Sequence, residues 1–231
     1  MKQIKGMQLG AVLAAMLLLS MAFVPAVTAK TEQIKESEML QYIDIQELYS
    51  LVDTYITEHP KATEEQINQY SLSQIRKLYT KYKDNGEITP QISYYGFTLN
   101  SEEENLFWEN PWKAINACYY GLSAQDETER VFGYNGHNDA SDAFRHAYWN
   151  TLMVKHIDYT WASRWATAHE EGATGQPAIE KEMDLWNNNK GRIIATDNPN
   201  ASDSELSNKV IDALNNGLLR KIVNDALAPT P

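Results

Sequence analysis

The chain has 231 residues, a length that allows one sizeable domain, or one domain with a helical appendage. It contains 31 Asp and Glu against 20 Lys and Arg, which gives a formal net charge of −11. A surface this acidic repels polyanions, and no stretch carries the basic run that neutralises phosphates, so we expect no nucleic-acid partner. The single cysteine, Cys118, cannot form an internal disulfide and lies in a stretch rich in Trp and Tyr, which is typical of a small buried hydrophobe rather than a nucleophile.

The first 29 residues are predicted to be a cleavable secretory signal. Lys2 and Lys5 form a positively charged n-region, residues 9–24 form an apolar segment, and small residues occupy positions 26–29 before the expected cleavage site. The apolar run is shorter than the roughly 20 residues that span a bilayer, and none comparable follows, so we expect no transmembrane segment in the mature chain. Cleavage after Ala29 would remove two lysines and no acid, which changes the formal charge from −11 to −13. The predicted location is extracellular or associated with the cell wall.

Residues 30–86 are predicted to form a helical hairpin. Apolar residues at helical spacing occur between positions 43 and 55, His59-Pro60 interrupts that pattern, and a capping box that begins at Thr63 opens a second helix. Residues 87–107 are predicted to be a linker with one candidate extended segment, because Pro90 and alternating aromatic residues favour extended backbone.

Residues 108–231 are predicted to form a helical core domain, and all six Trp lie in its first part. The predicted fold class is all-α: a multi-helix domain preceded by a two-helix N-terminal segment. The helices expected from caps and apolar periodicity are a short one after the capping box at Ser101, one at 111–121, one capped by Asn138 or Asp139 and ending near 157, and others at 161–171, 177–189 and from a Ser202 cap through 222.

Three of these helices carry the candidate site residues. Asp142 and His146 are four residues apart and share one helical face, which Asn150 extends by another turn. Asp184 and Asn188 form a similar row on a later helix. The predicted helix that lies between these two helices in the chain ends in His169-Glu170. Rows of this kind can converge on one polar pocket.

Two mechanisms fit such a pocket. The predicted metal ligands are Asp142, His146, His169 and Asp184, which would hold a divalent cation such as zinc. In a mechanism without metal, His146 or His169 acts as a general base oriented by Asp142 or Asp184, and Arg145 stabilises negative charge. The predicted substrate contacts are His137, Trp149, Asn187 and Asn188. The same polar residues could instead form a hydrogen-bond network that only holds the helices in register.

The motifs of this region resemble an uncharacterised bacterial domain family. They are Asp-Ala-Phe-Arg-His at 142–146, Ala-His-Glu at 168–170, and Met-Asp-Leu-Trp-Asn-Asn at 183–188. The resemblance covers roughly residues 108–222 and leaves the first helical pair outside. Members of this family occur as small exported proteins and at the C-termini of polymorphic toxins. The resemblance implies that the three stretches form one unit, and it favours an enzyme that acts on a cell-envelope component.

Three hypotheses follow for the function. The favoured one is a secreted hydrolase, metal-assisted or His-based, whose substrate is a component of the cell envelope. The second is a noncatalytic binding module whose aromatic residues line a groove. The third is an envelope scaffold, in which the first helical pair mediates association and the polar cluster is structural.

Overall fold

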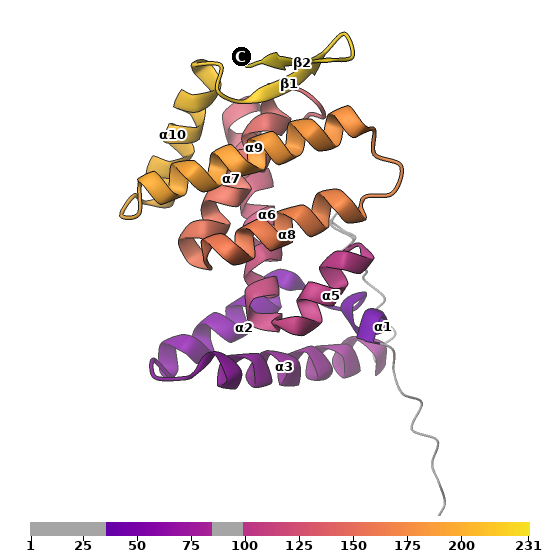
Figure 1. Cartoon of the computed structure of the whole chain (residues 1–231). Helices are drawn as coiled ribbons and strands as arrows, with labels where there is room; N and C mark the ends of the chain where they lie inside the picture. Colours follow the sequence, from indigo (N-terminus) through magenta and orange to yellow (C-terminus); the bar gives the residue numbers. More distant parts are fainter. Residues whose placement is uncertain (1–35, 85–98) are drawn as a thin grey trace, which may run out of the picture. The chain divides into compact units, whose positions relative to one another are not determined.

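The computed structural model describes residues 36–84 and 99–231, all within one unit that runs from Ile34 to Pro231. The predicted signal and most of the predicted linker, including its extended segment, lie outside the described residues. The described part consists of nine helices and one small antiparallel hairpin, which confirms the predicted all-α class (Figure 1). No helix in this part is long and apolar enough to cross a membrane.

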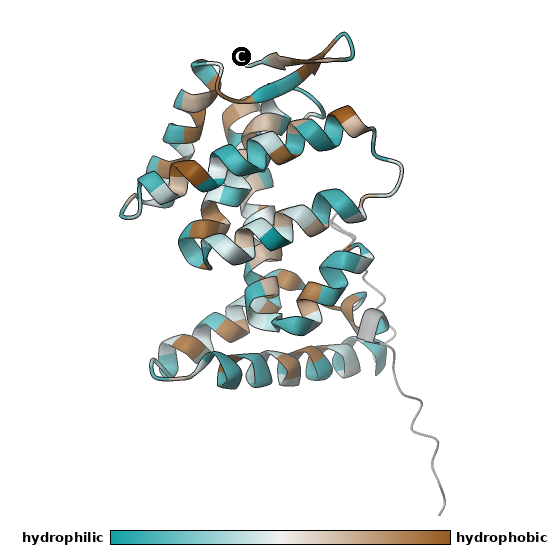
Figure 2. Cartoon of the chain, viewed as in Figure 1, coloured by the Kyte–Doolittle hydropathy of each residue, from teal (hydrophilic) through white to brown (hydrophobic). Residues whose placement is uncertain are grey.

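The N-terminal helical pair packs against the rest of the fold through its apolar face. A short helix α1 (Glu36–Leu40) precedes α2 (Ile45–Glu58), which Asp44 caps, and α3 (Glu64–Asp84) follows the predicted Thr63 cap. Figure 2 shows apolar residues recurring along α3 between hydrophilic ones, as an amphipathic helix requires. Tyr49 of α2 stacks on Tyr119 of α6 (Pro111–Phe132) with ring centroids 3.6 Å apart, so the pair is anchored to the core domain.

Helix α5 (Ser101–Glu109) begins one residue earlier than the predicted cap implied. Asn100, not Ser101, is the N-cap, and Glu103 completes the capping box by accepting from the Asn100 backbone. Asn100 also donates to the carbonyls of Ala168 and His169, which ties α5 to α8 (Tyr159–Gly172).

Helix α6 (Pro111–Phe132) is longer than predicted. The predicted end, Gly121, is buried inside the helix, which instead ends at Phe132 and is capped by Gly133, whose φ of 79° is left-handed. A glycine in that conformation is the usual C-terminal cap. Buried Cys118 lies in the middle of α6, which confirms its predicted packing role.

Three helices form the centre of the core domain: α7 (Ala140–His156), α8 (Tyr159–Gly172) and α9 (Ala178–Asp197). In Figure 1, α8 and α9 run side by side, and all three helices are in contact. Of the two predicted caps, Asn138 and Asp139, it is Asp139 that caps α7 by accepting from the backbone of Ser141 and Asp142. A Cβ at Gly191 of α9 would lie 1.9 Å from the Ala147 carbonyl oxygen, so α7 and α9 touch through their backbones.

The C-terminus departs from the predicted long helix. Helix α10 (Asp203–Asn215) begins at the predicted Ser202 cap but does not reach residue 222. Gly217 has a φ of 69°, and strands β1 (Arg220–Val223) and β2 (Ala226–Pro229) follow as an antiparallel pair. Asn224 and Asp225 both have positive φ, as the two central residues of a tight type I′ hairpin turn require. The apolar spacing of this stretch is compatible with a helix, but the positive φ of Gly217, Asn224 and Asp225 ends the helix and forms the hairpin instead.

Candidate functional site

A cluster of polar side chains lies in the interior, where α7, α8 and α9 meet. On α7, Asp142 and His146 keep only 1% and 5% of their surface exposed. On α8, Glu170 is 2% exposed, and on α9, Asp184 is 4% exposed. Burial of so many ionisable groups is costly unless they are paired or bind an ion. The cluster therefore marks a site or a dedicated network, not ordinary core packing.

His146 is the centre of the cluster. Its Nε2 atom lies 3.4 Å from Asp142 Oδ1 and 3.5 Å from Asp184 Oδ1. Its other ring nitrogen, Nδ1, lies 3.4 Å from Glu170 Oε1. One imidazole thus has carboxylates at both nitrogens, contributed by three different helices.

Asp142, His146 and Asp184 could hold a metal ion. Among the described residues they form one group whose ligand atoms all lie within 4.8 Å of one another. Tetrahedral coordination with bonds of about 2.1 Å places neighbouring ligand atoms about 3.4 Å apart. The two distances from His146 Nε2 match this edge. Nitrogen and oxygen ligands of this kind suit zinc, manganese and related divalent ions.

Glu170 is placed to orient His146 from the side away from the other two carboxylates. A carboxylate behind a metal-binding histidine is the usual outer-shell partner, because it fixes the tautomer and the ring orientation. Glu170 is itself held by Asn188, whose Nδ2 donates to Oε1 at 3.0 Å. Asn150 donates to Asn188 Oδ1 at 2.6 Å, so the support continues from α8 through α9 to α7.

Two buried atoms of the central groups make no hydrogen bond. Asp184 Oδ1 and His146 Nδ1 are both without a hydrogen-bond partner among the described residues, although each lies near an oppositely charged group. The other Asp184 oxygen accepts from Gln176 at 2.9 Å. A buried acceptor without a donor normally requires an explanation, and a cation at Asp184 Oδ1 would supply one.

The outer side of the cluster is formed by Asp142 and its neighbours. Arg145 hydrogen-bonds to Asp142 Oδ1, and its Nη1 atom lies 3.5 Å from His146 Nε2. The backbone N–H of Asn138 donates to Asp142 Oδ2 at 2.6 Å. His137 lies 3.6 Å from the same oxygen, and its side chain is 70% exposed. Arg145, whose side chain is 21% exposed, and His137 therefore stand between the buried acids and solvent.

The acid–base properties of the cluster follow from burial and from these charges. Burial opposes the charged form of Asp142, but His146 and Arg145 outweigh it and hold the pKa of that carboxyl below its usual range. Burial also acts to raise the pKa of Glu170, but His146 outweighs it and lowers this pKa to about 2. Burial raises the pKa of Asp184 to about 6, with the charges of Glu170 and Asp142 adding to it and His146 opposing it.

The imidazole of His146 is governed by its carboxylates. Burial acts against its charged form, but Asp184, Asp142 and Glu170 together raise its pKa to about 10. The cluster thus contains three acids against two bases, His146 and Arg145. A divalent cation would balance that surplus by replacing the proton of His146.

The predicted site residues are only partly brought together. Asp142, His146 and Asp184 meet, and Asn188 joins them through Glu170. His169 lies apart from the three ligand atoms: its ring centroid is 6.3 Å from that of His146, and its Nδ1 contacts Glu103 Oε1 at 2.8 Å. The sequence alone does not show whether His169 or Glu170 faces the cluster, because the rotation of α8 about its axis is set by packing. In the structure Glu170 faces His146, and His169 faces Glu103.

The predicted substrate contacts have mixed positions. His137 lies at the exposed edge of the cluster. Trp149 is 3% exposed, and its Nε1 donates to the Ala117 carbonyl at 2.8 Å, so its ring packs in the core. Asn187 is fully buried and exchanges two hydrogen bonds with the backbone of Arg220, which attaches β1 to α9.

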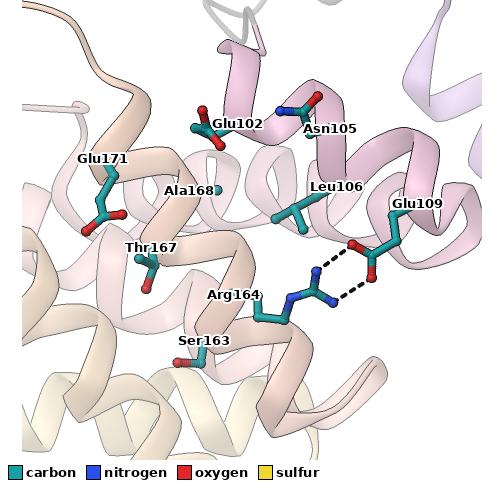
Figure 3. A pocket seen from close by; sticks show the side chains of 9 residues that line it. All are labelled: Glu102, Asn105, Leu106, Glu109, Ser163, Arg164, Thr167, Ala168 and Glu171. Atoms are coloured by element: carbon teal, nitrogen blue, oxygen red, sulfur yellow. Dashed lines mark hydrogen bonds and ion pairs between the residues drawn. The ribbon is translucent and has the colours of Figure 1, made fainter.

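A shallow groove lies on the outer side of α5 and α8, and none of the central residues lines it (Figure 3). Its volume is about 470 Å³. Figure 3 shows Arg164 spanning the groove to Glu109, to which it makes two hydrogen bonds. Glu102 and Glu171 add further negative charge along the groove. This groove is separate from the buried cluster.

Comparison with known proteins supports one part of the sequence analysis. Residues 104–218 match a family described as a domain of unknown function (DUF6973). The match is consistent with the predicted resemblance to an uncharacterised domain, and it includes α7, α8 and α9. No curated protein matches the chain, and neither does any solved structure.

Proposed function

We propose that the protein is a secreted metal-dependent hydrolase that acts on a component of the cell envelope. The observation that carries the proposal is the buried group of Asp142, His146 and Asp184, with ligand-atom separations of 3.4 and 3.5 Å around His146 Nε2. The predicted signal in residues 1–29 and the resemblance to exported proteins support the envelope as the place of action.

Each residue of the cluster has a role in this proposal. Asp142, His146 and Asp184 hold the cation, and Glu170 orients the imidazole of His146 through Nδ1. When bound, a divalent ion in such a site lowers the pKa of a water ligand towards neutrality and polarises the bond to be broken. Arg145 stabilises the negative charge that develops on the substrate, and His137 contacts the substrate at the exposed edge.

Arg145 also explains how the site is balanced without a metal. Its guanidinium reaches both Asp142 Oδ1 and His146 Nε2, two of the three atoms that a cation would bind. Because its side chain is partly exposed, it can swing towards solvent when a metal enters. Removal of this competing charge should therefore strengthen metal binding while it weakens catalysis.

The first test is metal content, measured by mass spectrometry on the purified protein and by titration of Zn²⁺ or Mn²⁺ after chelation. We expect one equivalent of metal in the wild type and none in Asp142→Asn, His146→Gln or Asp184→Asn. The matched control is the pair His156→Gln and Asp203→Asn, because these residues form a similar His–Asp contact at 2.9 Å outside the cluster. Both controls should keep the metal.

Catalysis is tested next with hydrolysis assays on purified envelope polymers and lipids. Arg145→Gln should bind metal at least as tightly as the wild type and hydrolyse more slowly. If the wild type binds no divalent ion and the cluster variants only lower the unfolding temperature, the metal proposal is refuted. The polar residues are then a structural network, which the Asn150–Asn188–Glu170 chain of hydrogen bonds also supports.

A further inference from the structure

Arg192 of α9 is a buried cation without an acidic partner. It is 8% exposed, and the other Lys and Arg residues of the described ranges are half-buried or exposed. No carboxylate of residues 36–84 or 99–231 forms an ion pair with it. A buried guanidinium is expensive to desolvate, and proteins normally pair it with an acid.

The contacts of Arg192 use only part of its hydrogen-bonding capacity. Its Nη1 atom donates to Asn150 Oδ1 at 2.7 Å, and its Nε atom is buried without a partner. The guanidinium also lies 5.9 Å from the centroid of the Tyr159 ring. Because a guanidinium has five N–H groups in a planar fork, these contacts leave part of its capacity for a bidentate acceptor unused.

The more exposed of the two side chains that contact the guanidinium is Tyr159. Asn150 is fully buried, whereas Tyr159, the first residue of α8, is 48% exposed. The acid next to Tyr159 in the chain, Asp158, is already engaged: it accepts from the Trp161 backbone at 2.7 Å and from Lys113 at 3.0 Å. Asp158 is therefore not available to neutralise Arg192.

We propose that Arg192 and Tyr159 form a binding site for an oxyanion, a phosphate or carboxylate group carried by a ligand. The guanidinium binds the oxyanion through its fork of N–H groups, and the Tyr159 ring and hydroxyl border the entrance. The site is separate from the proposed metal centre. Arg192 follows Asp184 by eight residues on α9, a distance of about 12 Å along the helix axis.

The experiment measures thermal unfolding of the full protein by circular dichroism in sodium phosphate, sodium acetate or sodium chloride at equal ionic strength, after chelation of metals. We expect phosphate or acetate to raise the midpoint of the wild type, saturably and by about 3 °C at ten times its Kd, relative to chloride. Arg192→Gln should abolish the shift. The matched control is Arg220→Gln, because Arg220 also lacks an acidic partner in the described residues but stacks on Trp186, and it should keep the shift.

The outcomes separate the possible ligands and the two proposals. A shift with phosphate alone assigns a phosphoryl ligand, and a shift with acetate alone assigns a carboxylate. The same shift in His146→Gln shows that the oxyanion site does not depend on the metal centre. If Arg192→Gln does not fold, Arg192→Lys and calorimetric titration of phosphate and acetate into the wild type replace it. Absence of binding to the wild type, or an equal shift without Arg192, overturns the proposal.

Discussion

Replacement of Gly191 by alanine tests the contact on which the whole cluster depends. The added Cβ would lie 1.9 Å from the Ala147 carbonyl oxygen, and ordinary contact requires at least 3.4 Å. Helices α7 and α9 must therefore separate by about 1.5 Å, because a backbone carbonyl has no alternative rotamer to adopt. Overpacking of this kind costs about 3 kcal/mol at the upper end, and the better helix propensity of alanine returns about 1 kcal/mol.

The net loss of about 2 kcal/mol should lower the unfolding midpoint by about 4–8 °C for a domain of this size. The separation would also stretch the 2.6 Å hydrogen bond between Asn150 and Asn188, so we expect weaker metal binding in the same variant. Thermal circular dichroism and zinc titration measure the two effects. The control is Asn189→Ala, an exposed position on the same helix that gains helix propensity without a clash. The reasoning fails if Gly191→Ala unfolds at the same temperature as Asn189→Ala.

Two further predictions concern the core and the pH dependence of stability. Trp149→Phe removes the donor to the buried Ala117 carbonyl and should cost about 1–3 kcal/mol in urea unfolding; an unchanged midpoint would contradict the stabilising role of this hydrogen bond. Burial opposes the charge of Asp203, but its hydrogen bonds to Lys155 and His156 hold the pKa of the carboxyl below its usual range. This stabilisation is present above the unfolded pKa near 4 and is lost as the pH falls through the folded value. Asp203→Asn should therefore lose less stability than the wild type between pH 5 and 2, as compared by urea titrations at each pH.

Local signals in the sequence were sufficient for much of the fold. Capping residues such as Asp139 and Ser202 accept hydrogen bonds from backbone N–H groups in the first turn of their own helix. This interaction does not depend on tertiary contacts, so these residues indicate the starts of α7 and α10 from the sequence. The rows Asp142–His146 and Asp184–Asn188 were equally readable, because positions four apart always share a helical face. The all-α class and both polar rows followed from these rules alone.

The tertiary structure decided which groups meet. His169 and Glu170 are neighbours in sequence, and only the packing of α8 between α5 and α9 turned Glu170 towards His146 and His169 towards Glu103. Local spacing also fitted a helix through residue 222, but the positive φ of Gly217 and the pairing of β1 with β2 produced a hairpin. Helical periodicity specifies which residues share a face but not what that face contacts. The contacts of Arg192 and Gly191 are therefore set only by the packing of α7, α8 and α9 against one another.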